Sequence, residues 1–108
     1  MKQSFLILGL LAVALPRLIA SPEDAAIIAA TKSYVAANSG MTKINATVEQ
    51  VEGDFARVKV TPENSKATDP ALVFLKKTDG KWIGLILGTS FTVEDYQQLG
   101  IPNSLRVN

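Results

Sequence analysis

The chain has 108 residues, of which 47% are hydrophobic and 19% charged, and it contains neither cysteine nor histidine. This length suits one domain. Without cysteine or histidine the chain has no disulfide, no thiolate nucleophile and no Ser-His-Asp or Cys-His site, and a zinc site is disfavoured. A carboxylate pair or a lysine nucleophile would still permit catalysis, so an enzyme is disfavoured but not excluded. We expect a protein that is not an enzyme and that holds no metal and no cofactor.

Residues 1–20 have the pattern of a secretory signal peptide. Lys2 precedes an apolar run over residues 5–15, which is shorter than the roughly 20 residues that a membrane-spanning helix needs. Ala20 then offers a small residue before a cleavage site. We predict a signal peptide at 1–20, a single domain at 21–108, and export to the periplasm or the extracellular space. The alternatives are a buried N-terminal helix and an uncleaved anchor at a membrane interface.

Cleavage would also change the sign of the net charge. The whole chain carries a formal charge of +1, and removal of Lys2 and Arg17 leaves nine basic and ten acidic side chains. The mature chain therefore has a net charge of −1 and shows no phosphate-binding pattern. We expect no nucleic acid partner and no membrane span in the mature chain.

The first expected element is a helix from residue 22 to about residue 38. Pro22 suits the first helical position, Glu23 and Asp24 complement the helix dipole, and Asn38-Ser39-Gly40 ends the helix. Most other positions are alanine, which lets a helix lie close to a sheet, so we expect this helix to be cradled by strands. One stripe at helical spacing faces the sheet: Ile27, Thr31, Tyr34, Val35 and Asn38.

The period of the pattern then changes to two, which predicts four strands. Their expected ranges are 44–51, 55–61, 71–77 and 82–87. In the first strand, Gln50-Val51 shifts the phase of the alternation. Glu52-Gly53-Asp54 is a turn, and Thr78-Asp79-Gly80-Lys81 is a strong hairpin signal. The polar segment 62–70 predicts a loop, and the third strand is expected at the centre because it begins apolar on both faces.

A short helix is expected after the strands, from Thr92 as its cap through Leu99, with Asp95 in the capping-box position and Gly100 closing it. The order predicts an α+β fold, in which an N-terminal helix packs on a four-stranded antiparallel meander and a short C-terminal helix follows. The second face of the sheet is either open or covered by residues 91–107.

Phe55 and Trp82 are expected on this second face, together with Leu85 or Leu87. An apolar sheet face without a covering element suggests a contact surface. Phe55, Trp82 and Leu85 are therefore the candidate contact residues. The leading hypothesis is a small exported binding or accessory domain without catalytic activity, which binds an unknown protein partner or a second copy of itself.

The element order resembles the cystatin-like fold, which is shared with NTF2-like domains, over about residues 22–90. Residues 75–82 are similar to the late hairpin of small secreted bacterial NTF2-like and lumazine-binding-like proteins, in which an apolar strand runs through a DGKW turn. NTF2-like relatives often pair through an open sheet face, so the resemblance implies a dimer or a partner complex.

Residues 49–53 resemble the Q-x-V-x-G motif with which cystatins enter papain-type peptidases. Val51 and Gly53 match this motif, whereas Glu49 replaces the glutamine of the family. Trp82 resembles the tryptophan of the second cystatin hairpin, although it follows Lys81 where the family has proline. The resemblance implies a cysteine-peptidase inhibitor that acts through Glu49, Val51 and Gly53. The alternative is an ordinary hairpin turn with Gly53 at positive φ.

A third hypothesis places a small apolar ligand, or a reaction, in a pocket between helix and sheet. NTF2-like pockets that host acid–base chemistry use an aspartate or a histidine, whereas the corresponding positions here are aliphatic. Thr31 and Tyr34 are the polar groups of the helix stripe that are expected to reach such a pocket. This favours a carrier of an apolar ligand over an enzyme, and the alternative for Tyr34 is core packing with its hydroxyl at the rim.

Overall fold

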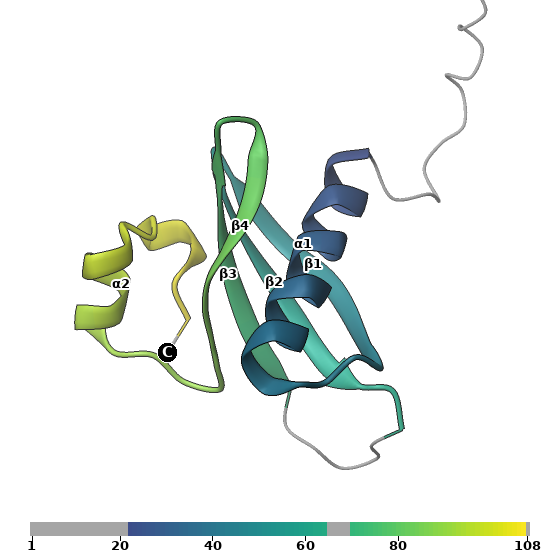
Figure 1. Ribbon diagram of the computed structural model, residues 1–108. Coiled ribbons are helices and arrows are strands. Elements are labelled where there is room, and N and C mark those ends of the chain that lie inside the picture. Colours follow the sequence, from purple (N-terminus) through teal and green to yellow (C-terminus); the bar gives the residue numbers. More distant parts are fainter. Residues whose placement is uncertain (1–21, 65–69, 108) are drawn as a thin grey trace, which may run out of the picture.

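The computed structural model describes residues 22–64 and 70–107, and the predicted signal peptide lies outside them. The element order is α1, four strands, α2 and a short 3-10 helix (Figure 1). This confirms the predicted α+β class and element order. The bounds are α1 Pro22–Ser39, β1 Ile44–Glu52, β2 Phe55–Pro62, β3 Ala71–Thr78, β4 Lys81–Gly88, α2 Val93–Leu99 and η2 Asn103–Leu105.

Helix α1 ends where the sequence predicts. Gly40 has φ +78°, and its N–H donates to Ala36 O at 2.9 Å, which satisfies a carbonyl of the last turn. Ile27, Thr31 and Val35 are buried, as the stripe predicts. Asn38 is a correction: it is exposed, because its side chain turns back to donate to the carbonyl of the preceding turn.

The four strands pair in the order β1-β2-β3-β4, and all neighbours are antiparallel. β3 is an interior strand, as predicted. The turn between β3 and β4 has Asp79 at φ +52° and Gly80 at φ +79°, the conformation that an Asp-Gly hairpin favours. A bulge at Glu49 accounts for the predicted phase shift in β1. A second bulge, at Leu85 in β4, was not predicted.

The main core lies between α1 and one face of the sheet, which we call the helix face. The edge strands β1 and β4 contact α1 more extensively than β2 and β3 do, so the sheet curves around the helix. This confirms the cradled arrangement. Burial of each large side chain here contributes about 1.5–3 kcal/mol. The buried apolar residues of this core are Ile27, Val35, Ile44, Ala56, Val58, Val60, Val73, Leu75 and Trp82.

The opposite sheet face, the second face, is covered by residues 91–107, which confirms one of the two expected alternatives. Phe74 of β3 is fully buried beneath this segment. Its ring meets Phe91 edge-on at 5.2 Å and Tyr96 at 5.7 Å between centroids. Ile101 and Leu105 complete this smaller core. Among the described residues, the C-terminal segment thus covers the apolar centre of this face around Phe74.

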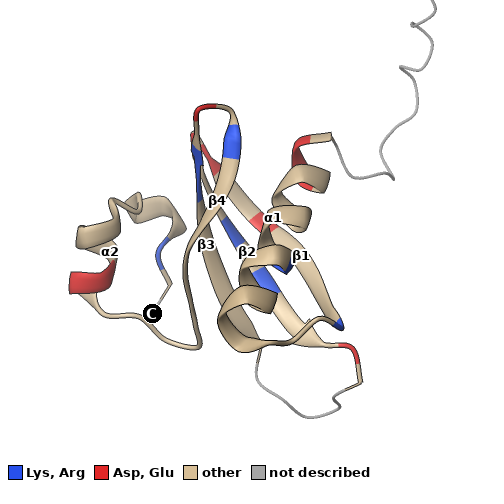
Figure 2. Ribbon diagram, in the orientation of Figure 1, with Lys and Arg blue, Asp and Glu red and all other residues tan. Residues whose placement is uncertain are grey.

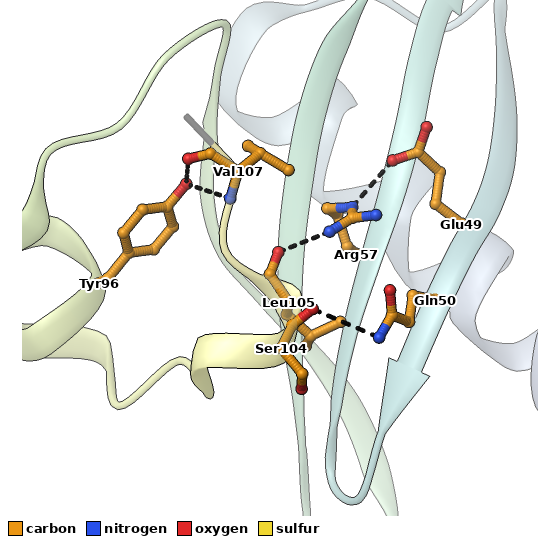
Figure 3. Close-up of polar contacts among 7 residues, drawn as sticks. All are labelled: Glu49, Gln50, Arg57, Tyr96, Ser104, Leu105 and Val107. Carbon is orange, nitrogen blue, oxygen red and sulfur yellow. Dashed lines mark hydrogen bonds and ion pairs between the residues drawn. The ribbon is translucent and has the colours of Figure 1, made fainter.

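Polar contacts hold this C-terminal segment in place (Figure 3). Tyr96 Oη donates to Val107 O at 2.6 Å and accepts from Val107 N–H at 3.0 Å. Arg57 of β2 donates to Leu105 O at 2.7 Å, and Glu49 pairs with the same guanidinium at 2.9 Å. Both faces of the sheet thus carry their own cover, α1 on one and the C-terminal segment on the other.

Candidate functional site

Trp82 lies on the helix face, so its predicted place on the second face is wrong. The two-residue turn sets the register of β4 so that Trp82 pairs with Lys77 and packs in the core beneath α1. Only 8% of the residue is exposed. Its indole Nε1 donates to Glu23 Oε2 at 2.8 Å. Trp82 therefore joins the start of α1 to β4.

Glu23, at the start of α1, makes the polar contacts of this junction. Its carboxylate also accepts from Lys77 Nζ at 3.0 Å, and this ammonium lies 5.9 Å from the centre of the Trp82 ring. The hydrogen bond from Lys77, and then that from Trp82, holds the pKa of the Glu23 carboxyl below its ordinary value. The cluster therefore ties the start of α1 to the second hairpin, because Glu23 Oε2 accepts hydrogen bonds from both Lys77 and Trp82.

Phe55 and Leu85 do not form a shared surface with Trp82. Phe55 is half-buried on the second face, where it packs against the core beneath the C-terminal segment. Lys76 Nζ lies 5.5 Å from its ring centre. Leu85 is half-buried and is the extra residue of the β4 bulge, between Gly84 and Ile86. The sheet itself thus separates Phe55 from Trp82.

The predicted inhibitor hairpin is an ordinary two-residue turn in conformation. Glu52 pairs with Phe55, and Gly53 has φ +60°. Antiparallel pairing places this turn at the same end of the sheet as the second hairpin, and the start of α1 is tied to that end through Lys77. Val51 is 40% exposed, whereas Glu49 is held by Arg57 in the bulge. The structure therefore groups the hairpins but buries the tryptophan that the resemblance assigns to their tip.

Thr31 and Tyr34 both take part in the packing of α1 on the sheet. Thr31 is fully buried, and its hydroxyl donates to Ile27 O at 2.8 Å, so its hydrogen-bonding need is met within α1. The Tyr34 ring packs directly on Gly84 of β4, and no side chain intervenes there. Both residues hold the helix against the sheet, and neither lines the cavity described next.

A half-open apolar cavity instead lies at the C-terminal end of α1, away from the hairpin turns. Its volume is about 250 Å³. It opens where the last turn of the helix passes over the ends of β2 and β4 and the beginning of β3. Its lining comes from α1, the following loop and three strands: Val35, Ser39, Met41, Val60, Pro62, Ala71, Leu87, Gly88 and Thr89.

A small residue leaves part of this space unfilled. Ala71, at the start of β3, projects only a methyl group at the cavity, whereas Gly88 lines it without a side chain to fill it, since a Cβ there would meet Phe91 instead. Met41, which is 40% exposed, lies at the edge of the cavity in the loop before β1. The sequence analysis did not single out Met41, although an apolar residue in the otherwise polar linker between α1 and β1 is a signal that could have drawn attention to this end of the molecule.

The charges of the protein lie elsewhere. No charged side chain lines the cavity among residues 22–64 and 70–107; α1 carries no charged residue after Lys32, and β4 carries none after Lys81 (Figure 2). Ser39 Oγ donates to Val35 O at 2.8 Å and accepts from Met41 N–H at 3.3 Å, so this hydroxyl is engaged by the backbone. The cavity walls therefore offer apolar contact and no strong polar recognition.

Within the described ranges, no cluster of three or more acidic side chains is arranged to hold a metal ion. The helices that the structure describes are too short or too polar to cross a membrane. Comparison of the chain with protein-family models, with curated protein sequences and with solved structures found no match. The cavity lined by α1, the following loop and three strands is the candidate site considered below.

Proposed function

We propose that this chain is an exported, non-catalytic binding domain that holds a small apolar ligand at the C-terminal end of α1. The observation that carries the proposal is the cavity of about 250 Å³ with its apolar lining. An engineered apolar cavity of about 150 Å³ stays dry and binds benzene, so a larger apolar space has enough contact area for a small ligand. Protein pockets for small molecules are likewise lined mainly by apolar side chains.

The chemistry of the chain supports binding over catalysis. The sequence contains no imidazole and no thiol, and no acid or base from the described residues lines the cavity. A reaction there would lack a group to transfer a proton at neutral pH. The proposal of export rests on the signal-peptide pattern at residues 1–20. The intact mass of the secreted protein tests it directly, because cleavage would remove these residues.

The test is ligand binding by the purified exported protein. Organic extraction followed by mass spectrometry identifies a co-purifying small molecule, and a titration with a hydrophobic dye measures the site. Ala71→Phe fills the cavity and is expected to lower dye affinity at least tenfold. Ala29→Phe adds the same side chain to the exposed side of α1 and serves as the matched control. Equal dye binding by both variants would refute the assignment of the site.

A second candidate is inhibition of papain-type peptidases through residues 49–53. The position of both hairpin turns and the start of α1 at one end of the sheet favours it. The burial of Trp82 and the ion pair of Glu49 weaken it, because neither side chain is free to enter a cleft. Titration of peptidase activity with the purified protein decides the matter, and absence of inhibition at micromolar concentration removes this candidate.

Association with a partner or a second copy through the second face would require displacement of residues 91–107. Such displacement would expose Phe74 and break the hydrogen bonds of Tyr96 and Arg57. The proposed function therefore does not depend on that face.

A further inference from the structure

We infer that the ligand is a free single-chain amphiphile whose alkyl chain of about ten carbons fills the cavity while its polar end remains in water. This inference rests on the proposed function and specifies the class of ligand. It is drawn from the size of the cavity, its half-open form, and the absence of charge from its lining.

The volume of the cavity sets the length of the ligand's alkyl chain. Benzene, with six carbons, occupies an apolar cavity of about 150 Å³, so in proportion the 250 Å³ found here accommodates about ten carbons. A two-chain lipid would place one chain in the cavity and leave the other in water. The volume therefore matches one chain and disfavours a phospholipid.

The open side of the cavity requires an amphiphile. A pure hydrocarbon would leave apolar surface exposed at the entrance, whereas a polar end group placed there keeps its hydration. Met41 borders this entrance, and an unbranched thioether side chain with several rotatable bonds adapts to alkyl chains of different shape. The exposed Thr89 is the only hydroxyl of the described lining that is not already bound to α1.

The lining also predicts whether affinity depends on the charge of the ligand's polar end group. Lys43 and Glu63 follow Met41 and Pro62 closely in the chain, but neither of them lines the cavity. With no cation or anion among the described lining residues, the site has no means of choosing a charged end group. Affinity should therefore depend on chain length and hardly at all on the sign of the end-group charge.

The experiment measures the affinity of the exported protein for two sets of ligands below their critical micelle concentrations. The first set is hexanol, octanol, decanol and dodecanol. Each added methylene should tighten binding about fourfold as far as decanol, and dodecanol should gain little more. The second set is decanol, decanoate and decyltrimethylammonium, whose affinities should lie within about threefold of one another. Naphthalene, a compact molecule of ten carbons, should bind more weakly than decanol.

A charged residue introduced at the entrance should give the site a preference for end groups of opposite charge. Met41→Lys places an ammonium beside the end group and should favour decanoate over decyltrimethylammonium by two- to fivefold, the range of an exposed ion pair. Ile83→Lys is the matched control, since Ile83 is also an exposed apolar residue and lies in β4 outside the cavity lining. The control should leave the ratio of affinities unchanged.

The outcomes distinguish failure of the proposed ligand-binding function from failure of the inference about the class of ligand. If no ligand of either set binds, the proposed function fails with the inference. If ligands bind but affinity does not rise with chain length, or naphthalene binds as tightly as decanol, the alkyl-chain inference is overturned while the cavity remains a binding site. Co-sedimentation with phosphatidylcholine vesicles would overturn the claim that the amphiphile is free, because the chain would then come from a bilayer lipid.

Discussion

Replacement of Gly84 by alanine tests how closely α1 lies against the sheet. Gly84 does not have positive φ, so alanine meets no backbone strain there. In a strand interior such a change normally stabilises a protein by about 0.5–1 kcal/mol. Here the new methyl carbon would lie 2.8 Å from Tyr34 Cβ and nearer still to the ring, whereas carbon atoms in contact are ordinarily about 3.5–4.0 Å apart. The sign of the effect should therefore reverse.

Overpacking of this kind costs about 1–3 kcal/mol. For a domain of this size a loss of about 2 kcal/mol lowers the unfolding midpoint by roughly 8–16 °C. Urea unfolding monitored by circular dichroism measures the loss. In a Tyr34→Ala background the ring is gone, so the same glycine-to-alanine change should be neutral or slightly stabilising, and the double-mutant cycle should show coupling of about 2 kcal/mol. An unchanged or raised stability of the single Gly84→Ala variant would refute the close packing of helix on sheet.

Three further variants test the polar contacts of the fold. Tyr96→Phe removes both hydrogen bonds to Val107 and should cost about 1–2 kcal/mol in urea unfolding, with faster amide exchange at Val107; unchanged exchange would contradict the anchoring role. Because the pKa of Glu23 is lowered in the folded protein, its contribution to stability is complete above the ordinary carboxyl range and is lost as pH falls through the folded-state pKa. The unfolding midpoint of Glu23→Gln, measured against pH, should lack this loss, and a profile equal to that of the parent would contradict the assignment. Asp95→Ala breaks the capping box of α2 and should cost about 1 kcal/mol in thermal unfolding, whereas Glu94→Ala, which leaves the box intact, should cost less.

The parts of the fold that local chemistry determines could be predicted from the sequence. The capping box of Thr92 and Asp95 and the left-handed Gly100 follow from short-range hydrogen bonding alone. The Asp79-Gly80 turn and the phase shift in β1 are likewise local features. These signals sufficed to give the order of the elements.

The placement of side chains on one face or the other was harder to predict. Alternation in β4 identifies two faces but does not tell which one meets the helix. The pairing of Trp82 with Lys77 and the bulge at Leu85 decide this, and both are set by the neighbouring strand. The cavity was still less accessible to sequence analysis, because it is a gap left where α1, a loop and three strands meet. An empty volume has no residue pattern of its own, and the polar positions Thr31 and Tyr34 therefore drew attention to the wrong part of the helix.

The most direct test of the account is a methyl-resolved NMR titration of the exported protein with decanol. The account predicts chemical-shift changes at the methyl groups of Val35, Met41, Val60, Ala71 and Leu87, which line the cavity. It also predicts none at Ile83, which is exposed outside the cavity. Shifts confined to residues away from the cavity, or no shifts up to the solubility limit of decanol, would contradict the assignment of a ligand site at the C-terminal end of α1.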